Sequence, residues 1–199
     1  MTGQGSTMKH SRGFSWIALG LLVALTTGCA QIKLGAPIAS MDNIQKARGA
    51  SMAPAALGHF ALAAGKDKSL DSSLSVRSNS LASPYDDSFA QYLKQTLAAE
   101  LQGAGLLDGT SPLLIEGVLV DNQLDAPIGT GRARIAARFS VVRAGKRVYD
   151  RELVASSTWD SPFVGAVAIP AAVNEYTALH RKLVAQLLDD PGFRAAVRQ

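Results

Sequence analysis

The chain has 199 residues, of which 47% are hydrophobic and 18% are charged, and its formal net charge is +4. This length and apolar content suffice for one domain with a real hydrophobic core. Lys9 and Arg12 lie within the first 28 residues, so the remaining 171 residues carry 18 basic and 16 acidic side chains, a net charge near +2. A nearly neutral chain gives no electrostatic case for nucleic acid binding, and we expect no such partner.

The chain begins with a pattern typical of an export signal. Lys9 and Arg12 precede an apolar run of 15 residues, from Phe14 to Gly28. As a helix this run would span only roughly 22 Å, less than the ~30 Å hydrocarbon core of a bilayer, which disfavours a permanent transmembrane helix. The pattern therefore predicts a signal peptide over residues 1–28, with either Met1 or Met8 as its start.

The end of this run predicts a lipid anchor. Thr26-Thr27-Gly28-Cys29 resembles the lipobox of bacterial lipoproteins, although Thr26 replaces the usual Leu. We expect cleavage before Cys29 and fatty acylation (palmitate) of this cysteine; the alternatives are a plain secreted protein and an uncleaved signal anchor. Cys29 is the only cysteine, so no intrachain disulfide is possible. By resemblance to Gram-negative lipoproteins, Ala30 favours the outer membrane, with the protein facing the periplasm.

The next segment shows little periodicity. Residues 29–56 contain Gly35, Pro37 and Gly49 and no clear apolar pattern. We interpret them as the lipidated Cys and a flexible tether, with an ordinary mobile terminus as the alternative. The folded periplasmic domain is then expected over residues 57–199.

The first half of this domain is predicted to hold two strands and a long helix. Residues 57–64 and 73–81 have strand patterns. Ser83, Pro84 and Asp86 resemble a helix start with a capping box. The helix is supported by apolar residues at every fourth position, which are Tyr85, Phe89, Leu93, Leu97 and Leu101.

The second half is predicted to hold three strands and another helix. Residues 113–124 are mostly apolar, residues 132–143 alternate between apolar and polar side chains, and residues 147–159 return after a turn. An apolar face over residues 169–188 predicts the second long helix, and a short helix follows Asp190-Pro191. The order is ββαβββα. It predicts an α+β fold, a two-layer sandwich in which a five-stranded, mainly antiparallel sheet carries two long helices on one face.

The charges predict the register of the last hairpin. Pairing Arg143 with Lys146 would direct Asp150 and Glu152 toward the core, which costs several kcal/mol. A three-residue loop would instead place Glu152 opposite Arg138 on the outer face, where such a pair contributes up to ~1 kcal/mol. We therefore expect the three-residue loop.

The candidates for catalysis are weak. His59 and His180 are the only histidines after residue 28, and neither has a His or Cys neighbour at the spacing of a metal site. The chain contains no Gly-x-Ser-x-Gly segment and no phosphate-binding loop. We expect no metal, no cofactor and no enzymatic activity.

Two features could support binding. The first is an arginine-rich patch, suited to an anionic partner unless the neighbouring carboxylates neutralise it; it consists of Arg132, Arg134, Arg138 and Arg147. The second is an apolar connection before the last long helix, which either tucks under the sheet edge or forms a partner-binding loop; it contains Phe163, Val164, Val167 and Ile169.

The lipobox and the order of elements resemble the YajG-type lipoproteins of bacterial envelopes. The resemblance is carried by the helix at 89–105, the strand at 114–120, the hairpin at 132–159 and the closing helix at 178–189. In outline the chain is also similar to the auxiliary lipoproteins of ABC-type lipid transport systems. The YajG type has no established activity, so the resemblance implies a location and a fold but no catalytic residues.

We therefore expect a non-enzymatic envelope lipoprotein, held at the membrane by the lipid on Cys29, that binds or supports an envelope protein. The alternative is an accessory lipoprotein of a lipid or ABC-type transport system that binds an acyl chain or an anionic headgroup; for an acyl chain it needs an apolar groove between sheet and helices. An envelope hydrolase is a third hypothesis, and it requires Ser, His and acidic groups to converge in the fold.

Overall fold

The structure is a computed structural model that describes residues 1–3 and 31–199. The predicted signal peptide from residue 4 onward, and Cys29 itself, lie outside the described residues. None of the helices in the described part is long and apolar enough to span a membrane.

The strands form two separate sheets. The larger sheet has the order β2-β5-β6-β7, with β2 at Ala56–Leu62, β5 at Leu113–Asp125, β6 at Gly129–Arg143 and β7 at Lys146–Ser161. β2 is parallel to β5, and the other neighbours are antiparallel. The smaller sheet has the order β1-β4-β3, with bounds Gln31–Lys33, Asn79–Ala82 and Leu74–Val76.

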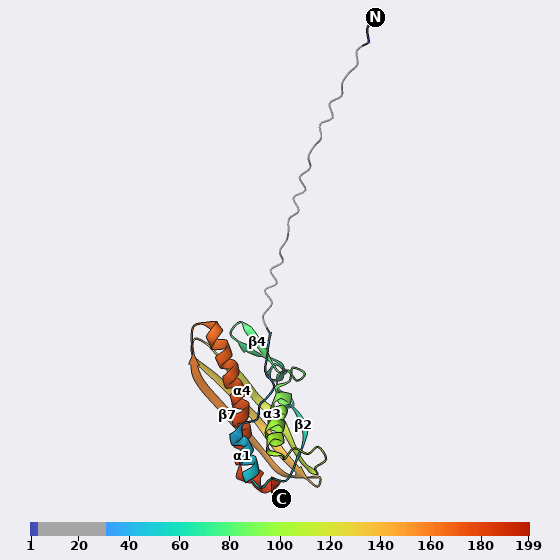
Figure 1. The fold of residues 1–199 in the computed structure, drawn as a ribbon, viewed down its shortest axis with the longest axis vertical. Helices are drawn as coiled ribbons and strands as arrows, with labels where there is room; N and C mark the ends of the chain where they lie inside the picture. The colour runs from blue at the N-terminus through green and yellow to red at the C-terminus, as the bar shows by residue number, and fades with distance from the viewer. Residues whose placement is uncertain (4–30) are drawn as a thin grey trace.

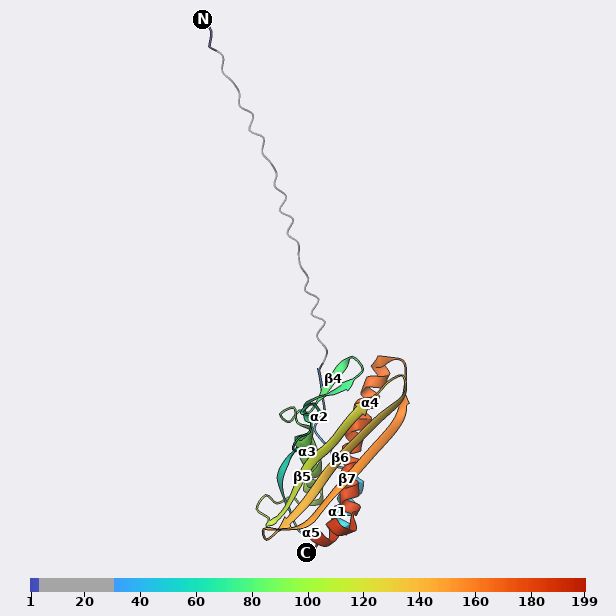
Figure 2. The ribbon, with the colours of Figure 1, turned by 180° about the vertical axis from the view of Figure 1, so that it is seen from behind.

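The long helices lie on one face of the larger sheet. The helices are α1 (Met41–Gly49), α2 (Ser69–Ser72), α3 (Phe89–Ala104), α4 (Gly165–Asp189) and α5 (Pro191–Val197). Figure 1 shows α3 and α4 side by side in front of the sheet, and Figure 2 shows the opposite face of β5, β6 and β7. Large buried side chains fill the space between these layers, among them Phe89, Tyr92, Phe139 and Tyr176.

The α+β class is confirmed, but the single five-stranded sheet is wrong. The predicted strand at 73–81 is broken by a turn in which Arg77 has a φ of +55°. The chain reverses there, so β3 and β4 form a short hairpin. This hairpin pairs with β1 and makes a second sheet near the end of α4 where that helix begins.

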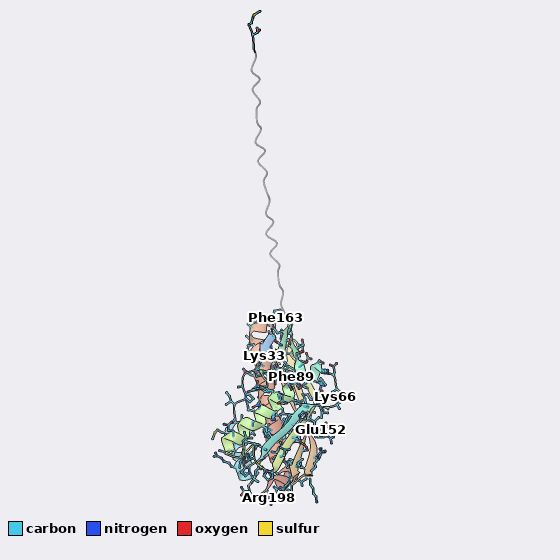
Figure 3. All side chains as sticks on the ribbon, turned by 90° about the vertical axis from the view of Figure 1, so that its right-hand side faces the viewer. Lys33, Lys66, Phe89, Glu152, Phe163 and Arg198 are labelled. Atoms are coloured by element: carbon cyan, nitrogen blue, oxygen red, sulfur yellow. The ribbon has the colours of Figure 1, made fainter. Side chains whose placement is uncertain are left out.

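Residues 31–56 are folded and do not form the predicted tether. β1 runs parallel to β4, and α1 begins after Ser40, whose hydroxyl accepts a hydrogen bond from the Asn43 N–H. Lys33 lies near one end of the domain, whereas Arg198 lies at the other (Figure 3). The folded part therefore begins by residue 31 and not at residue 57.

A buried carboxylate fixes this N-terminal segment to the helices. The side chain of Glu100 on α3 is fully buried and accepts hydrogen bonds from the Ser40 N–H at 2.8 Å and from the Asn43 amide at 3.0 Å. Asn43 also donates to the carbonyl of Arg181 on α4 at 3.1 Å. The N-terminus of α1 favours a negative charge at this position. One acidic side chain thus joins α1 to α3, and Asn43 extends the link to α4.

The start of α3 differs from its prediction. Ser88 caps this helix by accepting a hydrogen bond from the Gln91 N–H, whereas the Ser83 hydroxyl accepts from the Tyr85 N–H in a preceding turn. Asp86 in that turn has a φ of +51° and is not helical. Because Ser83 and Ser88 are both suitable caps, local sequence does not distinguish them.

The β6–β7 hairpin combines the two registers that were weighed against each other. Arg143 pairs with Lys146 across a two-residue turn, so the predicted three-residue loop is wrong. The two turn residues have positive φ angles, as in the turns that match strand twist. A bulge at Val148 then shifts the pairing by one residue. Arg138 consequently lies opposite Glu152, as predicted.

Removing the buried carboxylate should destabilise the domain. In Glu100→Ala, the half-buried Ser40 N–H and the buried Asn43 amide lose their acceptor, so we expect the free energy of unfolding to fall by about 2–4 kcal/mol. Urea unfolding followed by circular dichroism measures this change. The control is Glu152→Ala on the sheet surface, whose ion pair with Arg138 is exposed and whose effect should stay within about 0.5 kcal/mol. Equal effects of the two substitutions would contradict the role of Glu100.

Candidate functional site

The arginine-rich patch lies on the face of the larger sheet that points away from the core, and Figure 2 shows this face of the strands. Arg132, Arg134 and Arg138 alternate along β6 with the core-facing residues Ala133 and Ile135. Their position follows from the two-residue period of a strand. The structure therefore gathers the β6 arginines on one surface, and their partners on β5 and β7 decide their charge balance.

Three of the four arginines are paired with carboxylates. Arg134 forms an ion pair with Asp121 of β5. Arg138 lies 3.4 Å from Asp150 and 3.7 Å from Glu152. Arg147 also contacts Asp150, at 3.2 Å, so one carboxylate serves two arginines. These pairs are half-exposed and contribute little to stability, but they reduce the positive potential of the patch.

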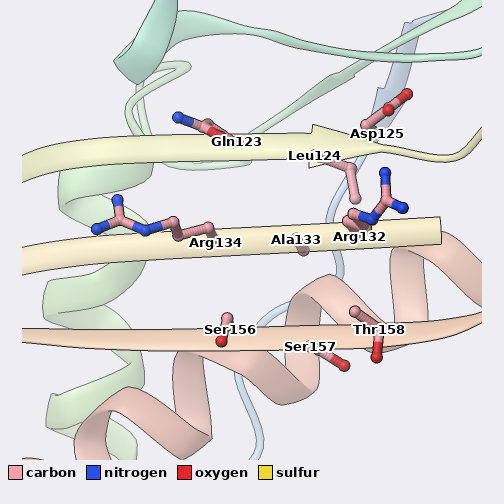
Figure 4. Close-up of a pocket in the computed structure, with 9 residues that line it drawn as sticks. All are labelled: Gln123, Leu124, Asp125, Arg132, Ala133, Arg134, Ser156, Ser157 and Thr158. Atoms are coloured by element: carbon pink, nitrogen blue, oxygen red, sulfur yellow. The ribbon is translucent and has the colours of Figure 1, made fainter.

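Arg132 differs from the other three. No ion pair within 4.0 Å involves it among residues 31–199, although it lies opposite Asp125 in the β5–β6 register. Arg132 borders a shallow hollow of about 340 Å³ that is also lined by Gln123, Ser156 and Thr158 (Figure 4). Asp125 and Arg134 line the hollow as well, but Arg134 is engaged by Asp121. The hollow therefore combines one arginine without an ion pair, one carboxylate and several neutral polar groups, and only Arg132 is available there to an anionic group.

The predicted apolar connection is partly helical, because α4 begins at Gly165 and not at residue 169, so Val167 and Ile169 lie in its first turns. Most of the connection is exposed. The exposed fractions are 75% for Phe163, 55% for Val164 and 57% for Val167, whereas Ile169 packs against the core. The structure adds Ile128 of the β5–β6 loop, which is 62% exposed and lines the same hollow as Phe163 and Val167. We call Ile128, Phe163, Val164 and Val167 the apolar tip. Sequence reasoning missed Ile128 because 35 residues separate it from Phe163.

Arg77 holds the backbone of this tip in place. Its guanidinium donates hydrogen bonds to the carbonyls of Ala126 at 3.0 Å, Pro162 at 2.7 Å and Phe163 at 3.1 Å. The same side chain donates to the Ser161 hydroxyl at 3.2 Å. One residue of the β3–β4 turn thus connects the β5–β6 loop to the start of α4. No sequence signal marked Arg77, because its partners are mainly backbone carbonyls.

His180 on α4 is a core residue. It is fully buried between the rings of Tyr92 and Tyr176, whose centroids lie 4.9 Å and 4.8 Å from its own. Its Nδ1 lies 3.0 Å from the Tyr176 carbonyl, so Nδ1 carries the proton and donates it there, while Nε2 has no partner in the described part of the chain. Burial lowers the pKa of His180 to about 4.

The described residues do not assemble a metal centre. His59 is exposed on β2, far along the chain from His180 on the second long helix. Within residues 31–199, no group of three or more His, Cys, Asp or Glu side chains could hold a metal ion.

Comparison with known proteins gives a fold but no family. No family model matches the sequence, and no curated protein matches it. The fold is similar to that of protein XCC0632 from Xanthomonas campestris, of family DUF330, with a TM-score of 0.55 and 6% identity; the match covers 83% of this chain and 96% of that one. At this identity the likeness shows a common fold alone.

Weaker matches involve proteins with lipoprotein names. A suspected lipoprotein from Caulobacter crescentus has a TM-score of 0.42 and 14% identity over 52% of this chain and 82% of that one. The minor lipoprotein from Acinetobacter baumannii has a TM-score of 0.36 and 11% identity, and the match covers 72% of this chain and 93% of that one. The YajG type that the sequence resembles is not among these names.

The buried histidine predicts a loss of stability in acid. The unfolded chain binds a proton at His180 below about pH 6.5, whereas the folded chain does so only near pH 4, so stability falls as the pH is lowered through this interval. The difference in pKa corresponds to about 3 kcal/mol. We expect the free energy of unfolding, measured with urea, to fall less between pH 7 and pH 4 in His180→Phe than in the wild type. Identical losses in the two proteins would contradict this assignment.

Proposed function

We propose that this protein is a lipid-anchored component of the bacterial envelope that acts by binding and not by catalysis. The observation that carries the proposal is the short spacing in the sequence between the predicted lipidated residue, Cys29, and the folded domain, which has formed by Gln31, two residues later. A domain that starts so close to its anchor works at the membrane surface. Export signal, lipobox and Ala30 together support an outer-membrane location facing the periplasm, with another envelope protein as partner.

Acylation of Cys29 tests this proposal. Cells grown with alkyne-labelled palmitate should incorporate label into the wild-type chain and not into Cys29→Ala, because only a cysteine thiol can form the thioether. The labelled chain should sediment with membranes, since two or three acyl chains hold stably where one does not. Unlabelled wild-type protein in the soluble fraction would refute the anchor. Crosslinking in intact cells would then identify the envelope partner.

A second candidate function is accessory binding of an anionic lipid headgroup in a transport system. It is favoured by Arg132, which lies beside the hollow without an ion pair among residues 31–199. The space between the sheet and the helices is less suited to an acyl chain, because the fully buried side chains of Phe89, Phe139 and Tyr176 occupy it. The headgroup, and not the chain, is therefore the group that this surface would bind.

Arg132→Ala should weaken such binding. We expect a loss of affinity for glycerol 3-phosphate of roughly 10- to 100-fold, measured by NMR titration, because a charge-assisted hydrogen bond contributes about 1.5–3 kcal/mol. The matched control is Arg138→Ala on the same strand, which should leave binding unchanged because Asp150 and Glu152 already engage that arginine. Equal losses of affinity in both variants would mean that only the net charge matters. Absence of binding by the wild type would contradict this candidate function.

A further inference from the structure

β1, the first strand of the folded part, lies at the end of the domain that carries the apolar tip. Gln31 of β1 pairs with Ser80 of β4, and the two strands run in the same direction. Arg77, in the turn that precedes β4, donates a hydrogen bond to the Phe163 carbonyl. Figure 3 shows Lys33 and Phe163 toward one end of the domain and Arg198 at the opposite end.

The distance from the lipid to this end is limited by the covalent chain. Cys29 lies two residues before Gln31, and two fully extended residues reach at most ~7 Å. The predicted tether over residues 29–56 would have separated the domain from the bilayer, but β1 and α1 lie within it and belong to the folded domain. The end that carries β1 must therefore lie at the membrane surface.

The chemistry of the tip suits the bilayer interface. Phe163 is 75% exposed, so a polar side chain could replace it without loss of core packing. Phe163 and Val167, together with Ile128, line an open hollow of about 500 Å³. The charged residues nearby include Asp160 in the hollow and Asp125 and Arg132 beside it, so both signs are present. Attraction to the surface would depend on burial of apolar side chains more than on net charge.

We propose that the apolar tip inserts into the bilayer that holds the Cys29 lipids, so that the domain stands on the membrane with α4 directed away from it. This inference rests on the proposed function, because it requires acylated Cys29. The partner of the apolar tip is the lipid interface, because Cys29 lies only two residues before Gln31. The four hydrogen bonds of Arg77 position the loop so that Phe163 points outward when the bilayer is absent.

Tryptophan fluorescence on the acylated full-length protein tests the insertion. Phe163→Trp is reconstituted in vesicles of phosphatidylethanolamine and phosphatidylglycerol that contain phosphatidylcholine brominated at a shallow or a deep acyl position. Exposed Phe163 tolerates the change, and Val167→Trp serves as a second reporter on the same tip. Trp159 remains in the processed chain, so the wild type gives its background signal. The matched control is Val154→Trp, whose position on β7 is 40% exposed on the outer sheet face.

We expect blue-shifted emission from Trp at positions 163 and 167, quenched most by the shallow bromines, because interfacial side chains lie ~5–10 Å below the headgroups. Trp at position 154 should show neither effect. Acylation is verified by mass on the same sample. An acylated protein whose tip reporters are quenched no more than the Val154→Trp control overturns the insertion and leaves the proposed function intact. A protein that carries no acyl group removes both.

Discussion

The buried carboxylate of Glu100 is the interaction on which the arrangement of the N-terminal segment depends. A carboxylate in a dry interior is costly unless its oxygens accept hydrogen bonds, and here the donors come from Ser40 and Asn43. The helix core is thus complete only when residues 31–49 lie against it. This requirement makes residues 31–49 part of the domain and not a spacer before it.

Much of the larger sheet and both long helices follow from periodicity. The alternation along β6 predicted its buried side chains, because each strand residue reverses face, and the repeat from Phe89 to Leu101 predicted the buried stripe of α3. The charges predicted that Arg138 would face Glu152. These features are local or depend on simple pair energies, so a single sequence is enough to derive them.

The errors have long-range causes. Asn43 and Glu100 are 57 residues apart, and nothing near Asn43 indicates that its amide is buried against a carboxylate. The break of the predicted strand at Arg77 also depends on distant residues, because the Arg77 side chain donates a hydrogen bond to the carbonyl of Phe163. Gly117 gave no signal either, yet a Cβ there would lie 2.4 Å from the Phe60 ring. The tip was only half visible from the sequence, because Ile128 joins it through tertiary contact.

The bulge at Val148 has a consequence for neighbouring copies. β7 is an edge strand of 16 residues, and a straight edge of that length is a template for pairing with another chain. The unpaired residue interrupts the hydrogen-bonding ladder, and the nearby charges of Arg147, Asp150 and Glu152 oppose stacking. The same irregularity that corrects the register therefore disfavours edge-to-edge pairing between copies of this chain.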